Sequence, residues 1–200
     1  MFFMNVLRKI NHGFDKTYNF SLLKWKKCKI GKNVRVNGRL KVYGNKGGLS
    51  IGDGVIINSN IDYNPIGGWS GCSFFCRDNG WITICEGAGI SNSAFCSASS
   101  IVIEKQVYIG GGCRIYDTDF HSIDFKQRMQ SPDVHIKSKP VVIKRGAWIG
   151  GGSIILKGVV IGEYSVIGAG SVVTRSVPAG EIWAGNPARF IRKLDEIKEG

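Results

Sequence analysis

The aliphatic residues in the C-terminal half of the chain recur at every sixth position. Small or β-branched residues follow each of them four places later, and glycine follows several of them directly. An amphipathic helix would need a period near 3.6 and a half-buried strand a period of 2. A six-residue unit therefore predicts short strands joined by tight turns. The aliphatics are Ile143, Ile149, Ile155, Ile161, Ile167 and Val173, and the small positions are Ala147, Ser153, Val159, Ser165, Ser171 and Val177.

The same phase recurs earlier in the chain, although less regularly. Three hexads would close one triangular coil, whose inward aliphatics stack on those of the next coil. No single coil buries its own hydrophobic face, so the pattern predicts one continuous all-β solenoid. The earlier hexads are Ile84, Ile90 and Cys96; Ile103, Ile109 and Ile115; Ile30, Val36 and Val42; and Ile51 and Ile57.

The hexad register is interrupted twice. It fails between residues 58 and 81, which predicts an irregular coil or a loop, and again between Ile115 and Ile143. A packed coil has no room inside for extra residues, so residues 121–140 are expected to project from the solenoid. Loops on rigid scaffolds are common places for chemistry.

Residues 1–29 form a separate segment. Apolar residues at helical spacing predict an amphipathic helix whose other faces carry basic residues. Such a helix either binds an anionic membrane surface peripherally or packs on its own protein or a neighbouring subunit. The apolar residues are Phe3, Val6, Leu7, Ile10, Phe14 and Tyr18, and the basic ones are Arg8, Lys9 and Lys16.

Charge and cysteine content indicate which partners and metals the protein is expected to lack. The net charge of +12 is concentrated in residues 1–50, where twelve Lys and Arg accompany only Asp15. Because the charge lies at one end and no interleaved aromatic and basic motif accompanies it, we expect no nucleic-acid partner. The six cysteines include no CxxC pair and are expected to be reduced, buried thiols of a cytoplasmic protein. Cys72 and Cys76 have no second pair to complete a zinc site, so no metal is expected.

The C-terminal repeats carry a family resemblance. The units IGGGSI, ILKGVV, IGEYSV and IGAGSV, followed by VVTRSVPAGEIWAGNPARFIRKL, resemble the hexapeptide-repeat acyltransferases over roughly residues 30–194. The chain is most similar to O-acetyltransferases of sugars and surface polysaccharides, akin to the galactoside and maltose acetyltransferases. The resemblance implies a left-handed parallel β-helix over residues 30–188 and a homotrimer that binds acetyl-CoA between subunits. Residues 189–200 are expected to form a short C-terminal helix or tail.

His121 is the candidate catalytic residue, because it stands where the repeat stops, at the base of the expected loop. A sugar hydroxyl needs a base before it attacks a thioester, and imidazole titrates in the right range to accept its proton. Asp119 or Asp117 could bind the other ring nitrogen and fix the tautomer. The local sequence alone favours His121 and the neighbouring aspartates as turn residues, and the resemblance reverses this in favour of catalysis. His135, deeper in the loop, either shapes the acceptor pocket or is a surface residue.

The resemblance also implies positions for the two substrates. Asn92 matches a sugar-binding asparagine, although it could instead hold a corner of the coil. Trp148 matches a residue that lines the pantetheine arm, and the backbone amide of Gly151 is a candidate oxyanion donor. The remaining matches to acetyl-CoA contacts are Ala169 to the arm, Thr174 and Arg175 to the adenine and ribose phosphate, and Arg189 and Arg192 to the phosphates.

Other functions remain open on the sequence alone. The acceptor could be the amine of a nucleotide-linked amino sugar rather than a hydroxyl. A zinc enzyme similar to the γ-carbonic anhydrases uses the same β-helix, but it needs three histidines, whereas His121 and His135 supply two. A non-catalytic β-helix scaffold is the third alternative.

Overall fold

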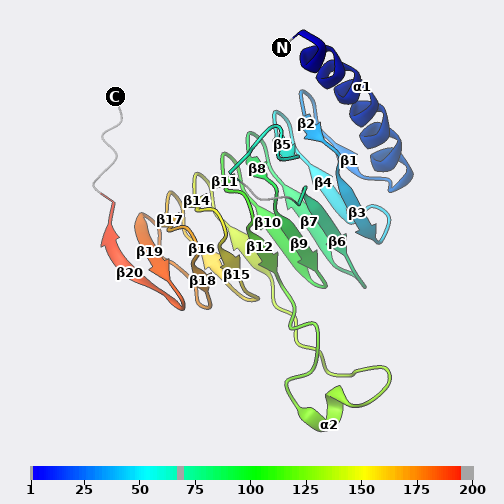
Figure 1. Ribbon diagram of the computed structural model, residues 1–200. Coiled ribbons are helices and arrows are strands. Elements are labelled where there is room, and N and C mark those ends of the chain that lie inside the picture. Colours follow the sequence, from blue (N-terminus) through cyan, green and yellow to red (C-terminus); the bar gives the residue numbers. More distant parts are fainter. Residues whose placement is uncertain (1, 67–69, 195–200) are drawn as a thin grey trace.

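The protein is a three-sided prism of stacked coils, with a helix at one end and a loop projecting from its side (Figure 1). The computed structural model describes residues 2–66 and 70–194, and side chains from Gly13 onward within them. Each coil contributes one short strand to each of three sheets. This confirms the left-handed parallel β-helix.

The strands of the three faces follow one another in regular rotation. Face 1 contains β1 (Lys29–Ile30), β4 (Leu49–Ile51), β7 (Trp81–Ile84), β10 (Ser100–Ile103), β13 (Val141–Ile143) and β16 (Val160–Ile161). Face 2 contains β2 (Arg35–Gly38), β5 (Ile56–Ser59), β8 (Gly89–Ser91), β11 (Tyr108–Ile109), β14 (Trp148–Ile149), β17 (Val166–Ile167), β19 (Glu181–Gly185) and β20 (Ala188–Lys193). Face 3 contains β3 (Lys41–Gly44), β6 (Ser73–Cys76), β9 (Ala94–Ser97), β12 (Arg114–Tyr116), β15 (Ile154–Ile155) and β18 (Val172–Val173).

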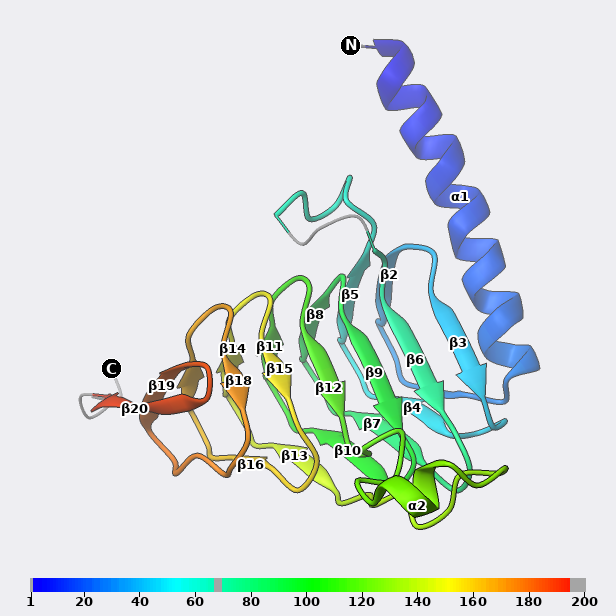
Figure 2. The ribbon, with the colours of Figure 1, turned by 60° about the horizontal axis from the view of Figure 1, so that its bottom comes forward.

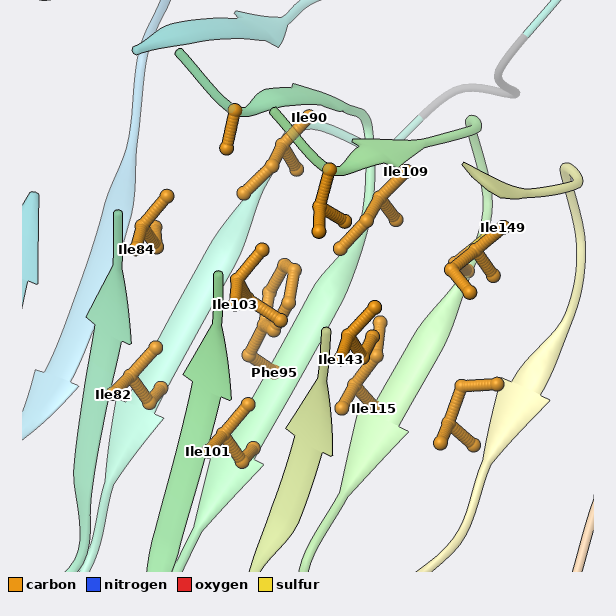
Figure 3. Close-up of a cluster of buried hydrophobic side chains, with 14 of the residues drawn as sticks. Ile82, Ile84, Ile90, Phe95, Ile101, Ile103, Ile109, Ile115, Ile143 and Ile149 are labelled. Atoms are coloured by element: carbon orange, nitrogen blue, oxygen red, sulfur yellow. The ribbon is translucent and has the colours of Figure 1, made fainter. Parts of the chain in front are cut away.

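The hexad aliphatics form columns inside the prism, as the period predicted. On face 1, Ile103 pairs with Ile143, which in turn pairs with Ile161, and all three side chains are fully buried. Figure 3 shows such side chains from successive coils pointing into one shared interior. Stacking like onto like fills the column without voids, which is the main source of stability in a coil too short to have a core of its own.

Residue Cys96 does not occupy the inward position that its hexad phase indicated. Phe95 points inward instead and pairs with Ile115, while its ring stacks on that of Phe74 at 5.0 Å between centroids. The turn before β9 is one residue shorter than the period requires, and this shifts the side chain that faces the core.

The small corner positions are occupied by serine for a specific reason. Ser153 is fully buried and donates its hydroxyl to the carbonyl oxygen of Gly150 at 2.7 Å. A buried hydroxyl with such a partner carries little penalty. At Gly150 an added Cβ would lie 2.5 Å from the backbone nitrogen of Ala169, so the close approach of successive corners requires glycine there.

The N-terminal helix α1 (Phe2–Trp25) covers the first coil. Asn19 is buried, donates to the Gly38 carbonyl at 2.8 Å and accepts from the Leu40 amide at 3.0 Å. Asp15 forms an ion pair with Arg39 at 2.6 Å. The helix prediction and its packing on the body of the protein are confirmed; the side chains of Phe3, Val6, Leu7 and Ile10 lie outside the described ones.

The C-terminal helix prediction is wrong for the described residues. Ala188–Lys193 forms β20, which pairs antiparallel with β19 in a hairpin. An uncovered last strand would leave a row of unpaired backbone groups, and β20 occupies that edge. Residues 195–200 of the expected helix lie outside the described part of the chain.

The stacked interior predicts unequal effects from two adjacent residues of β16. Ile161→Ala should lower the free energy of unfolding by about 2–5 kcal/mol, because it leaves a cavity in the column. Val160 points outward on the same strand, so Val160→Ala should lower it by less than about 1 kcal/mol. Urea denaturation of both variants measures the difference, and equal losses would contradict the assigned inward and outward positions.

Candidate active site

Both interruptions of the repeat leave the prism at its corners. Residues 60–66 and 70–72 lie between faces 2 and 3, and residues 117–140 between faces 3 and 1. Figure 2 shows the two segments on different edges of the prism. The two ends of the second loop, residues 117–119 and 137–139, pair with each other and form its neck. The Asp119 amide donates to the Lys137 carbonyl at 3.1 Å, and the Lys139 amide donates to the Asp117 carbonyl at 2.9 Å.

The carboxylate of Asp117 fixes the neck to the preceding coil. It is fully buried and accepts hydrogen bonds from the Ser97 hydroxyl at 2.6 Å, the Ala98 amide at 2.7 Å and the Ser99 amide at 2.9 Å. Three donors satisfy a buried carboxylate. Asp117 therefore holds the corner, and its side chain does not contact His121.

Asp119 faces the following coil. Its Oδ1 lies 2.5 Å from the Nζ of Lys157, in a pair whose side chains are both mostly buried. Its Oδ2 is buried and has no hydrogen-bond partner among the described residues. This ion pair connects the neck to the turn after β15. The carboxylate that contacts the His121 ring belongs to a different residue.

That acid is Asp133, which the sequence analysis did not select. Its Oδ2 lies 3.0 Å from Nδ1 of His121, and the same oxygen accepts from the Ser122 amide at 3.1 Å. The His121 side chain is 72% exposed, whereas that of Asp133 is only 14% exposed. A ring that donates from Nδ1 to this carboxylate keeps a lone pair on Nε2, directed away from the pair. In this structure Asp133, rather than Asp119 or Asp117, is the acid whose side chain contacts the His121 ring.

The loop beyond His121 has its own internal support. Asp124 caps helix α2 (Phe125–Arg128) by accepting from the Gln127 amide at 3.0 Å. The Arg128 guanidinium donates to the carbonyl of Ser122 at 2.7 Å. These bonds hold the segment after His121 in one conformation. His135 lies exposed on the returning half of the loop with a φ of 57°.

The residue before His121 adopts an unusual backbone conformation. Phe120 has a φ of 67°, a backbone angle that residues other than glycine adopt only when their surroundings enforce it. Its ring packs edge-on against Tyr116 at 5.0 Å between centroids. Burial raises the pKa of the Tyr116 phenol, so this ring remains neutral and packs as an apolar group.

Asn92 stands at the other edge of face 3. It is 1% exposed, and its Nδ2 donates to the carbonyl of Asn64 at 3.1 Å, so in this structure it holds the segment that follows β5. Its Oδ1 is buried without a partner among the described residues. Within one chain, the structure does not bring Asn92 and His121 together, because they lie at different corners.

The residues matched to acetyl-CoA contacts fall into two groups. Trp148 is exposed on face 2, and Gly151 and Ala169 lie in consecutive turns of the corner beside it. Thr174 and Arg175 follow β18 at the corner between faces 3 and 1, where Arg175 lies 5.3 Å from the ring of Trp183. Arg189 and Arg192 are exposed on β20, which belongs to face 2.

The cysteines take no part in this constellation. The thiol of Cys113 is buried and donates to the Gly150 carbonyl at 3.3 Å, and burial raises its pKa. Burial raises the pKa of both Cys72 and Cys76 to about 12. All six cysteines are free, and Cys28 and Cys85 are only partly buried. The described residues contain no group of three His, Cys, Asp or Glu arranged to hold a metal ion.

A shallow depression of about 340 Å³ lies at the corner between faces 1 and 2. It is lined by Glu86, Gly87, Lys105, Gln106 and Arg145, and the Lys105–Glu86 ion pair of 2.9 Å crosses it. None of the candidate site residues lines this depression. The geometry of His121 and Asp133, rather than this hollow, therefore defines the candidate site.

Comparison with known proteins agrees with the repeat. Residues 140–175 match the family described as bacterial transferase hexapeptide, six repeats. The resemblance to the hexapeptide-repeat acyltransferases is confirmed. YJL218W of Saccharomyces cerevisiae, named as a candidate acetyltransferase, is 42% identical over 105 residues, 52% of each chain. Nodulation protein L of Rhizobium leguminosarum is 48% identical over 98 residues, 49% of this chain and 50% of its own.

A solved structure extends the likeness over most of the chain. AntD, an N-acyltransferase from Bacillus cereus solved with dTDP and coenzyme A, is 26% identical with a TM-score of 0.70, covering 88% of this chain and 89% of its own. The chain spans only about half the length of the curated relatives it matches. Within the described residues, no helix is both long and apolar enough to span a bilayer.

The Lys157–Asp119 ion pair is expected to restrain the neck of the loop. Lys157→Gln should loosen the neck and increase the rate of tryptic cleavage at Lys126 and Arg128 several-fold, because opening precedes cleavage. Lys144→Gln is a matched control, since Lys144 also forms a carboxylate pair, with Glu104 at 2.9 Å, but away from the loop. Cleavage can be followed by mass spectrometry, and equal rates in both variants would show that the pair does not restrain the neck.

Proposed function

We propose that the protein is an acetyl-CoA-dependent O-acetyltransferase that acetylates a sugar hydroxyl, in a surface polysaccharide or its precursor. The observation that carries this proposal is the His121–Asp133 pair, placed at the base of a braced loop on a hexapeptide prism. The named acetyltransferase relatives and the coenzyme A complexes of AntD support an acyl-CoA donor. The free cysteines fit a reducing compartment such as the cytoplasm.

The arrangement supports direct transfer without a covalent enzyme intermediate. Nε2 of His121 accepts the proton of the acceptor hydroxyl while its oxygen forms a bond to the thioester carbonyl carbon. The Asp133 carboxylate stabilises the imidazolium that results. When the tetrahedral intermediate collapses, the carbon–sulfur bond breaks, and the departing thiolate takes the proton from Nε2. The products are the acetyl ester and free coenzyme A.

Two kinds of contact are proposed for the thioester substrate. The backbone amide of Gly151 lies in a glycine-rich corner where an oxyanion can approach closely, and it is the candidate donor to the developing charge. The indole of Trp148 offers an exposed apolar surface to the pantetheine arm. Arg189 and Arg192 are candidate partners for the phosphates. Ala169, Thr174 and Arg175 remain expected contacts of the arm and the nucleotide.

A single chain leaves these groups apart, and this motivates the homotrimer. Trp148 lies on face 2, whereas His121 leaves the corner between faces 3 and 1. Symmetric closure about a threefold axis would place His121 of one subunit beside face 2 of its neighbour. The active site would then be completed between subunits, where water is excluded from the reacting groups.

Transfer to an amine is the second candidate. The likeness to AntD, an N-acyltransferase solved with dTDP-4-amino-4,6-dideoxyglucose and coenzyme A, favours a nucleotide-linked amino sugar as acceptor. Assays with matched hydroxyl and amino acceptors distinguish the two. Stoichiometric zinc would instead favour the alternative of a zinc enzyme similar to the γ-carbonic anhydrases. Failure to bind acetyl-CoA in calorimetry would favour the non-catalytic β-helix scaffold.

The general base can be tested by His121→Ala. The turnover number should fall by about 100-fold to 10,000-fold, since no other group would accept the hydroxyl proton. Release of coenzyme A in the presence of saccharide acceptors measures the rate, and calorimetry should show acetyl-CoA affinity close to that of the wild type. Unchanged turnover would exclude His121 as the base.

The same assay tests which acid orients the imidazole. Asp133→Asn should lower kcat with little change in KM for either substrate, because the ring loses its tautomer preference and its support. Asp119→Asn makes the same chemical change at the acid paired with Lys157, and it should lower kcat less. The reverse order would return the orienting role to Asp119.

The cofactor face can be tested separately. Trp148→Ala should raise KM for acetyl-CoA about tenfold with a smaller effect on kcat, because it removes binding surface remote from the reacting atoms. Trp81→Ala is the control, since Trp81 is similarly exposed but lies on face 1. If both variants shift KM equally, the assignment of face 2 to the cofactor fails.

A further inference from the structure

Helix α1 presents a surface that the proposed reaction does not use. While one side of the helix packs on the first coil, its outer side leaves Phe14, Phe20 and Trp25 exposed by 64%, 68% and 61%. Lys16 and Lys24 are exposed among these aromatic side chains. Exposed apolar residues mark a binding surface when they lie together, and these three lie on one helix.

The charge around this surface is strongly positive. The first 50 residues contain twelve Lys and Arg and one acid, Asp15, which is buried and already paired with Arg39. The exposed basic side chains of α1 and of the first coils are Lys16, Lys24, Lys27, Lys29, Lys32, Arg35, Arg39, Lys41 and Lys46. Such a concentration attracts polyanions and is complementary to anionic lipid headgroups.

Basic side chains lie directly beside two of the aromatic rings on this surface. The Nζ atoms of Lys26 and Lys46 lie 4.8 Å and 5.5 Å from the centroid of the Trp25 ring, and the guanidinium of Arg39 lies 5.4 Å from that of Tyr18. Amphipathic rings accompanied by basic side chains are typical of residues at the boundary between headgroups and acyl chains.

The position of α1 allows its outer surface to contact an extended flat surface. In Figures 1 and 2 the helix lies across the N-terminal end of the prism, and its first turns extend past the coils. In the trimer of the proposed function, three parallel prisms would present three such helices at the same end. Three weak attachments to one surface bind far more tightly than one.

We propose that the outer surface of α1 and the adjoining basic turns bind the anionic phospholipid surface of a membrane. Binding is peripheral: the aromatic side chains enter the headgroup region and the lysines remain at the phosphates. A lipid surface fits better than a protein partner, because the basic groups are spread over the whole prism end. The reaction would then take place next to lipid-linked acceptors; this consequence and the threefold attachment rest on the proposed function.

Vesicle sedimentation of the full chain tests the charge requirement. Vesicles with roughly one third phosphatidylserine should bind the protein, and phosphatidylcholine vesicles should bind it much less, with the difference lost at high salt. Each lysine near such a surface strengthens binding about fivefold, so Lys16→Glu combined with Lys24→Glu should weaken it about 25-fold or more.

A matched control carries the same change of charge elsewhere. Lys126→Glu combined with Lys193→Glu alters exposed lysines on α2 and β20, and it should bind phosphatidylserine vesicles within about twofold of the wild type. If this control loses as much binding as the α1 variant, or if neutral vesicles bind as well as anionic ones, the proposal is overturned.

Lipid contact can also be read from Trp25 directly. Brominated acyl chains should quench part of the wild-type tryptophan fluorescence, and Trp25→Phe should abolish most of that quenching. Ultracentrifugation supplies the competing outcome: if the Lys16 and Lys24 changes alter the subunit number and leave vesicle binding intact, α1 is an interface between copies of this chain. His121→Ala should bind vesicles normally, so loss of transfer and loss of lipid binding are distinguishable.

Discussion

The coil-to-coil stacking of this prism fixes which side chains of each strand point inward, one or two per strand. The strands on each face are bonded to the coils before and after them, so Ile143 is fixed between Ile103 and Ile161. An additional residue cannot be stored in such an interior without breaking the register on all three faces. It must leave at a corner, and both long insertions do so.

That constraint divides the four acids of one loop among different tasks. Asp117, nearest the coil, meets the amides of the preceding corner and becomes part of the scaffold. Asp119, one pair further along the neck, reaches Lys157 of the following coil. Asp124 caps α2, and Asp133, on the returning half of the loop, contacts His121. Identical carboxylates thus differ in role because the neck places each against a different neighbour.

The repeat made most of the fold predictable, because a period of six fixes both the strand positions and the side chains that face inward. Prediction failed where the period gave no information. One missing turn residue exchanged Cys96 for Phe95 in the core, and ARFIRK continued the edge of β19 as a strand although it had no hexad neighbour. Asp133 was missed because a contact across twelve residues of loop leaves no periodic trace. An acid on the returning half of the loop was the only signal available.

The exposure of His121 gives the fold a further consequence. Its partner Asp133 is well covered by the loop, yet the ring itself is open to water. Electrostatic interactions are weak in that environment, because the surrounding dielectric constant is high. Closure by a neighbouring subunit would remove water from the ring, strengthen its interaction with the carboxylate and bring a second wall to the substrates. The single prism therefore supplies a braced His121–Asp133 pair, and the proposed assembly would supply the enclosure that a general base at this position needs.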